Sequence, residues 1–236
     1  MAKAYSTWTV LPHRPVEKLE DNLWRVEGDL PGMPLKRVMT LARRSDGGVV
    51  IHNGIALEEA AMREVEAWGR PAFLVVPNGY HRLDAAVFKQ RYPALKVLCP
   101  RGATKAVAEV VAPDGSYDDL PPDESVRLEH LAGTAEREGV MIVRSNGRTS
   151  LVFNDAIFNM PHKPGFSGFV MRYLTDSSGG PKVTRIGRLF VMKEAPALRA
   201  HFERLATPDL ARIVVSHEDV ITDKPADTLR AIAATL

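Results

Sequence analysis

The chain has 236 residues, of which 45% are hydrophobic and 25% charged, a composition that excludes disordered, collagen-like and coiled-coil proteins. The 31 Lys and Arg residues nearly balance the 29 Asp and Glu residues, and no apolar run is long enough to cross a bilayer, so we expect neither a nucleic-acid nor a membrane partner. The single cysteine, Cys99, and an N-terminus without a secretory signal pattern predict a cytoplasmic protein.

Residues 1–22 are polar and rich in proline, and we expect them to form an arm ahead of a single domain at 23–236. In the first half of that domain, β-rich segments alternate with amphipathic ones. The predicted strands are 38–42, 49–52, 72–76 and 96–99, and the predicted helices are 57–68, 84–92 and 103–111. Strands alternating with helices through short loops indicate crossover connections and a sheet that is at least partly parallel.

A polar linker at 112–122 precedes a different pattern in the second half. Strands are predicted at 126–131, 140–143 and 149–153, the last two joined by an Asn-Gly turn that is typical of a hairpin. Residues 154–186 contain several prolines and glycines and are expected to form a long irregular loop, a feature that often carries function. A helix at 196–205, a strand at 213–215 and a helix at 225–234 complete the chain.

Unusual polar residues follow four of the predicted strands, one of which, 126–131, leads to Gly133-Thr134, and the other three lead to a His or Asp. His81 lies in the loop after strand 72–76, Asp155 follows strand 149–153 and His217 follows strand 213–215. A His or Asp just beyond a buried strand is held rigidly and still reaches solvent, as a metal ligand or general base requires. These strand ends are therefore the candidate functional site.

Two motifs carry a resemblance to a known family. Residues 152–158, Val-Phe-Asn-Asp-Ala-Ile-Phe, are similar to a strand that ends in Gly-Asp-Ala, and residues 214–217, Val-Val-Ser-His, are similar to a last strand that ends in a histidine ligand. Together with the order of elements over 23–236, they resemble the metallo-β-lactamase fold superfamily, and in particular a subgroup with an altered metal motif. The resemblance implies an α/β (α+β) fold, the four-layer αββα sandwich, in which Asp155 matches the metal-bridging aspartate and His217 the final histidine ligand.

The family's other metal ligands are missing from this chain. Where the family has His-x-His-x-Asp-His, the corresponding residues are Asn78, Tyr80, Arg82 and Leu83, and where it has Gly-His, this chain has Gly133-Thr134. None of these side chains is a good zinc ligand. The complete binuclear site of the family is therefore not expected.

A mononuclear site is one hypothesis. If the loop is displaced by one residue from the family geometry, His81 approaches Asp155 and His217, with His52 and His162 as alternatives. Two histidines and one carboxylate are a familiar set of ligands for Zn, Fe or Mn. The cofactor is thus one divalent metal ion or none.

Structural roles are open alternatives for the same residues. Asp155 is equally suited to accept hydrogen bonds from backbone N–H groups, and His217 to be a neutral imidazole without a ligand role. Asp84 fits the N-cap of the helix at 84–92 better than a ligand position. Tyr80 is more typical of a packing residue.

The sequence leaves two functional hypotheses. The first is a hydrolase in which Asp155 and His217 are catalytic and a metal ion activates water toward an ester, thioester, lactone or phosphodiester. The second is a metal-free member that binds a small molecule or has a structural role. Asn78, Tyr80 and Thr134 are expected to contact the small-molecule partner. Basic residues near the long loop could contact an anionic group: Arg185, Arg188 and Lys193.

Overall fold

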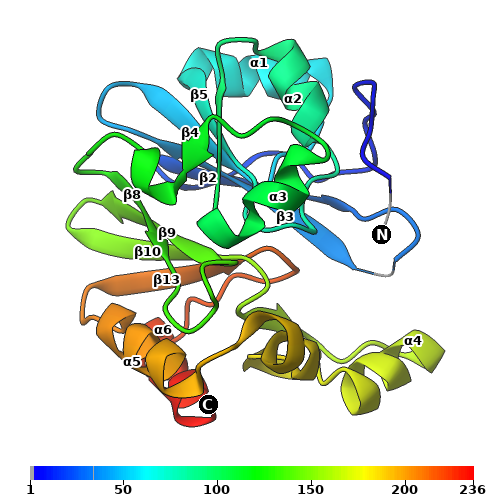
Figure 1. Cartoon of the computed structure of the whole chain (residues 1–236), viewed down its shortest axis with the longest axis vertical. Helices are drawn as coiled ribbons and strands as arrows, with labels where there is room; N and C mark the ends of the chain where they lie inside the picture. The colour runs from blue at the N-terminus through cyan, green and yellow to red at the C-terminus, as the bar shows by residue number, and fades with distance from the viewer. Residues whose placement is uncertain (1–2, 34) are drawn as a thin grey trace.

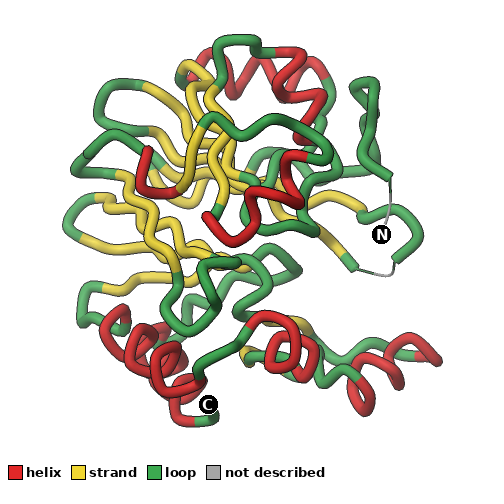
Figure 2. Tube along the Cα trace, viewed as in Figure 1, coloured by secondary structure: helices red, strands yellow, loops and turns green. Residues whose placement is uncertain are grey.

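Two large β-sheets organise this mixed α/β fold (Figures 1 and 2), seen in a computed structural model that describes residues 3–33 and 35–236. The first, with seven strands in chain order, contains β1 (Glu17–Glu20), β2 (Leu23–Asp29), β3 (Lys36–Arg43), β4 (Gly48–His52), β5 (Arg70–Val75), β6 (Lys96–Cys99) and β7 (Gly115–Ser116). The second has the order β13-β10-β9-β8 and contains β8 (Val126–His130), β9 (Gly139–Ser145), β10 (Arg148–Phe153) and β13 (Leu210–Val215). A separate pair joins β11 (Phe158–Met160) to β12 (Gly180–Lys182).

The seven-stranded sheet changes direction at β4. Strands β1 to β4 run antiparallel, whereas β4 to β7 run parallel. The parallel strands are connected through α1 (Glu59–Trp68), α2 (Ala85–Arg91) and α3 (Thr104–Ala108). Every residue of β4 is buried, as expected for a strand covered on both faces. The predicted crossover connections are therefore present.

The apolar core consists of three clusters, one between the two large sheets and one between each sheet and its helices. One lies between the two large sheets, where Val50 and Val75 pack in the same cluster as Val152 and Val214. A second joins the seven-stranded sheet to α1, α2 and α3, and a third joins the four-stranded sheet to α5 (Ala195–Leu205) and α6 (Pro225–Ala234). Figure 1 shows α1 and α2 at one end of the view and α5 and α6 at the other, with the sheets between them. No helix of the described residues has the length and apolar character needed to span a bilayer.

The segment expected to be an N-terminal arm is part of the folded unit. β1 pairs with β2, so the predicted boundary between residues 22 and 23 separates two hydrogen-bonded strands. Further upstream, the Trp8 indole N–H donates to the Leu57 carbonyl at 2.9 Å, and its ring packs on Phe88 with 5.0 Å between centroids. This corrects the arm prediction over residues 3–22, because tertiary contacts order a polar, proline-rich segment.

The segment predicted as an irregular loop over 154–186 contains helical turns. After β11 come α4 (Gly165–Phe169) and η3 (Val170–Leu174), and η4 (Gly187–Val191) follows β12. Figure 1 shows α4 projecting away from the two sheets. Glycines and prolines lower helix propensity, and they hid these turns from sequence reasoning.

Candidate metal centre

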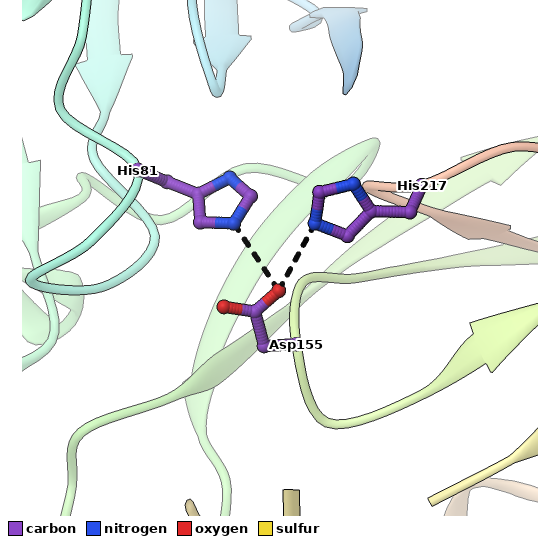
Figure 3. Close-up of side chains that lie close together, drawn as sticks. All are labelled: His81, Asp155 and His217. Atoms are coloured by element: carbon purple, nitrogen blue, oxygen red, sulfur yellow. Dashed lines mark hydrogen bonds and ion pairs between the residues drawn. The ribbon is translucent and has the colours of Figure 1, made fainter. Parts of the chain in front are cut away.

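His81, Asp155 and His217 converge from three separate strand ends (Figure 3). β10 and β13 are parallel neighbours with Phe153 opposite Val215, so residues two positions beyond each strand emerge side by side. The loop between β5 and α2 brings His81 to the same place. Nε2 of His81 lies 3.1 Å from Oδ1 of Asp155, and Nε2 of His217 lies 3.3 Å from the same oxygen.

Both imidazole rings are oriented by contacts on their far side. Nδ1 of His217 is 2.7 Å from the backbone carbonyl of Lys36, and Nδ1 of His81 is 3.3 Å from Oδ1 of Asn53. Because the Asn53 amide donates to the Val38 carbonyl at 2.9 Å, its oxygen is the atom facing His81. A neutral ring in either position therefore carries its proton on Nδ1 and directs the Nε2 lone pair at Asp155.

The donor set fits a metal ion. Two lone pairs facing one carboxylate oxygen repel unless a cation, either a proton or a metal ion, lies between them. Zinc–nitrogen bonds of about 2.0–2.1 Å in a tetrahedron place neighbouring donor atoms about 3.3 Å apart. The two N–O separations are close to this value, and all three donor atoms lie within 4.8 Å of one another. This cluster could hold a metal ion.

The electrostatics of the cluster favour positive charge between its members. Burial acts to raise the pKa of Asp155, but the charge of His81 and the hydrogen bonds from both histidines hold that pKa well below its usual value. Burial acts to lower the pKa of His217, but Asp155 outweighs burial and raises it. Asp155 is therefore ionised, and protons compete with a metal ion for the same imidazole lone pairs.

Asn78 holds two of the candidate ligands in place. Its Oδ1 accepts the backbone N–H groups of Tyr80 and His81 at 2.8 and 2.9 Å. Its Nδ2 donates to Oδ2 of Asp155 at 2.8 Å and to Oε1 of Glu138 at 2.6 Å. This buried amide has no hydrogen left to donate, so the predicted substrate-binding role of Asn78 is corrected to a positioning role.

Glu138 is a site residue that sequence reasoning missed. It is buried, and burial together with the nearby Asp155 charge raises its pKa well above its usual value. Its Oε1 also accepts from Nδ2 of Asn154 at 3.3 Å, whereas Oε2 has no partner among the described residues. The only signal was an acid next to the apolar strand β9, in the charged run Glu136-Arg137-Glu138, and such acids are common on surfaces.

The other two predicted substrate contacts, Thr134 and Tyr80, differ in their exposure to solvent. Thr134 is fully buried and its hydroxyl donates to the Leu131 carbonyl at 2.7 Å, so its predicted substrate contact is corrected to a structural hydrogen bond. Tyr80 is 60% exposed and adjoins His81, which leaves its phenol accessible to a ligand. Tyr80 is thus the predicted contact residue that remains available.

The alternative ligands lie outside the cluster. Nδ1 of His162 is 3.0 Å from the Ser178 hydroxyl, and neither His162 nor His52 belongs to the group of converging donors. Asp84 occupies the N-cap position of α2 but makes no capping hydrogen bond. It forms a buried ion pair with Arg37 instead, which corrects the predicted cap.

His52 predicts a specific pH dependence of stability. It is fully buried, both ring nitrogens lack partners among the described residues, and burial and the charge of His81 lower its pKa from 6.5 to about 3. Between pH 6.5 and about 3, the imidazole of His52 is protonated in the unfolded chain and neutral in the folded chain. The free energy of unfolding therefore falls as the pH falls below 6.5, by up to about 1.4 kcal/mol per pH unit from this residue. His52→Met removes this effect.

Urea unfolding at a series of pH values from about 6 to about 4 measures it. The difference in unfolding free energy between His52→Met and the wild-type protein should shift in favour of the variant as the pH falls. A difference that is the same at every pH would contradict the assignment of a neutral, buried imidazole.

Comparison with known proteins does not assign a family. A scan against protein-family models finds no match to this chain, and a search of curated proteins finds no similar sequence. Function is therefore argued from the residues and geometry of the candidate metal centre.

Proposed function

We propose that the chain is a metal-dependent hydrolase with a mononuclear site formed by His81, Asp155 and His217. The observation that carries this proposal is the convergence of two oriented imidazoles on one ionised carboxylate. Partly or fully buried His and Asp side chains placed this way, with the pKa values of Asp155 and His217 shifted, are typical of functional sites. Asp155 and His217 are the proposed catalytic residues.

The fold is proposed to be the αββα sandwich of the metallo-β-lactamase type. Helices pack on the outer side of each large sheet, and a third apolar cluster fills the space between the sheets, which supports this assignment. The site also lies at strand ends, where folds of this kind place their chemistry. Cys99 is a free, buried thiol, in keeping with the predicted cytoplasmic location.

The chain's own residues would orient the reaction. A divalent ion (Zn, Fe or Mn) held at the site supplies Lewis acidity, which lowers the pKa of water and polarises a carbonyl or phosphoryl group. The Lys36 carbonyl and Asn53 fix the rings of His217 and His81, and Asn78 fixes the Asp155 carboxylate. The exposed phenol of Tyr80 is placed to contact a small substrate bearing an ester, thioester, lactone or phosphodiester.

The proposed activity can be tested with chelator-treated protein reloaded separately with Zn, Fe or Mn. We expect one of the four substrate classes to be hydrolysed only by the reloaded protein, and the rate to fall at least about a hundredfold in His217→Ala. His162→Ala, which removes an imidazole outside the cluster, should retain the activity. Metal bound at one equivalent with no hydrolysis of any class would contradict the proposal.

A metal-free binding protein is the second candidate. It is favoured by the internal hydrogen bonds that already connect all three candidate ligands. Metal analysis of protein purified without added metal separates the two candidates. Less than about a tenth of an equivalent, with thermal stability unchanged by chelator, would favour the second.

A further inference from the structure

Residues 161–193, which are called the arm from here on and are distinct from the N-terminal segment 1–22, expose a regular apolar face. Phe166, Phe169, Tyr173 and Leu174 follow helical spacing across α4 and η3, and each is more than half exposed. On η4, the neighbouring residues Leu189 and Phe190 are also exposed, with exposed fractions of 66% and 58%. In an ordinary soluble helix this face would be covered, so a row of exposed aromatic and leucine side chains indicates a surface that binds something.

The arm also concentrates positive charge. It contains six Lys and Arg residues and one acid, Asp176, which leaves 25 basic and 28 acidic residues in the rest of the chain. Among the described residues, no carboxylate pairs with four of these cations: Arg172, Arg185, Arg188 and Lys193. The net charge of +2 for the whole chain averages over this difference, and the expectation of no membrane partner rested on the lack of an apolar run long enough to cross a bilayer.

Two arginine side chains lie beside the apolar face. Nη1 of Arg185 donates to the carbonyls of Tyr173 and Leu174, both at 3.1 Å, and the residue is exposed. The Arg172 guanidinium lies 5.3 Å from the centre of the Tyr173 ring. Two cations thus border the exposed aromatic residues, and helices that lie at a membrane interface likewise combine a Lys- and Arg-rich face with an aromatic and leucine face.

We propose that the arm docks on the surface of an anionic lipid bilayer, with its apolar side chains among the lipid headgroups and its Lys and Arg residues paired with lipid phosphates. A second copy of the chain fits less well, because pairing arm against arm brings like charges together. The proposal does not depend on a bound metal ion. The arm is connected to the candidate site through β11, which pairs with β12 of the arm and carries Phe158, whose ring stacks on His217 with 4.9 Å between ring centroids.

Vesicle sedimentation tests the proposal directly. We expect the protein to bind vesicles of phosphatidylcholine with phosphatidylglycerol, to bind phosphatidylcholine vesicles much less, and to be released by salt. The double variant Phe166→Ser, Phe169→Ser should reduce the partition coefficient at least about tenfold. Arg172→Gln, Arg188→Gln should weaken binding to the anionic vesicles alone. Arg70→Gln, an exposed cation outside the arm, is the matched control and should bind as the wild-type protein does.

Three results would overturn the proposal. The first is no binding to anionic vesicles. The second is a loss of binding in the control variant as large as in the arm variants. The third is absence of vesicle binding together with self-association in sedimentation velocity that the phenylalanine variant abolishes. The last result would assign the surface to a second copy. Circular dichroism of each variant checks that the fold is retained.

Discussion

Asp155→Asn is expected to abolish metal binding, from about one equivalent to less than about a tenth, and to leave the fold intact. The asparagine keeps the shape of the side chain and can still accept the hydrogen bond that Asn78 donates to Oδ2. It removes the negative charge on the oxygen that lies 3.1 and 3.3 Å from the two histidine nitrogens. With its oxygen accepting from Asn78, the amide turns its NH2 group toward the two imidazoles, and an NH2 group does not ligate Zn, Fe or Mn.

Isothermal titration of chelator-treated protein with zinc measures this effect. His162→Ala serves as the matched control, because it deletes an imidazole that lies outside the cluster, hydrogen-bonded to Ser178. The control should bind zinc with unchanged stoichiometry and affinity. Zinc binding that survives in Asp155→Asn, or that is lost equally in His162→Ala, would mean that the metal binds elsewhere.

Asp84→Ala is expected to cost about 3–5 kcal/mol of unfolding free energy, the largest effect of a single substitution that we predict for stability. Asp84 and Arg37 are both buried, and the aspartate is the ion-pair partner of the guanidinium. Arginine cannot lose its proton in a protein, so removing Asp84 leaves an uncompensated buried charge. Because Asp84 ends the loop that carries His81, metal affinity should fall as well.

Removing the other member of the pair should cost less. Burial raises the pKa of Asp84, with Arg37 opposing that effect, so the carboxyl group can take up a proton in Arg37→Met. Asp227→Ala, which breaks an exposed pair with Arg230, should change stability by less than about 1 kcal/mol. Urea unfolding of the three variants gives the comparison. An Asp84→Ala variant as stable as Asp227→Ala would contradict the assignment of a buried ion pair.

The placement of Asp155 and His217 is the part of the site that sequence reasoning predicted best. Both follow continuous apolar runs, and such runs indicate buried strands, which β10 and β13 are. Once parallel neighbours are assumed, residues just beyond two strand ends must lie close together. His81 was a weaker prediction, because the position of a side chain in the nine-residue loop between β5 and α2 depends on loop conformation.

The supporting residues could not be predicted, for a physical reason. Asn78 and Glu138 are 60 residues apart, and their hydrogen bond exists only because the two sheets pack face to face. Neither residue has a spacing or neighbour that distinguishes it from a surface amide or acid. The same limit explains Asp84, whose expected helix cap is a local contact but whose ion-pair partner, Arg37, lies 47 residues away in the chain.

The most direct test of the metal centre is a crystal structure of the zinc-soaked protein, with diffraction recorded on both sides of the zinc absorption edge. We expect one anomalous peak about 2 Å from Nε2 of His81, Nε2 of His217 and a carboxylate oxygen of Asp155. Two results would contradict a metal centre at this position. One is zinc bound elsewhere with no peak at the cluster, and the other is a structure in which the three side chains lie on separate faces of the molecule.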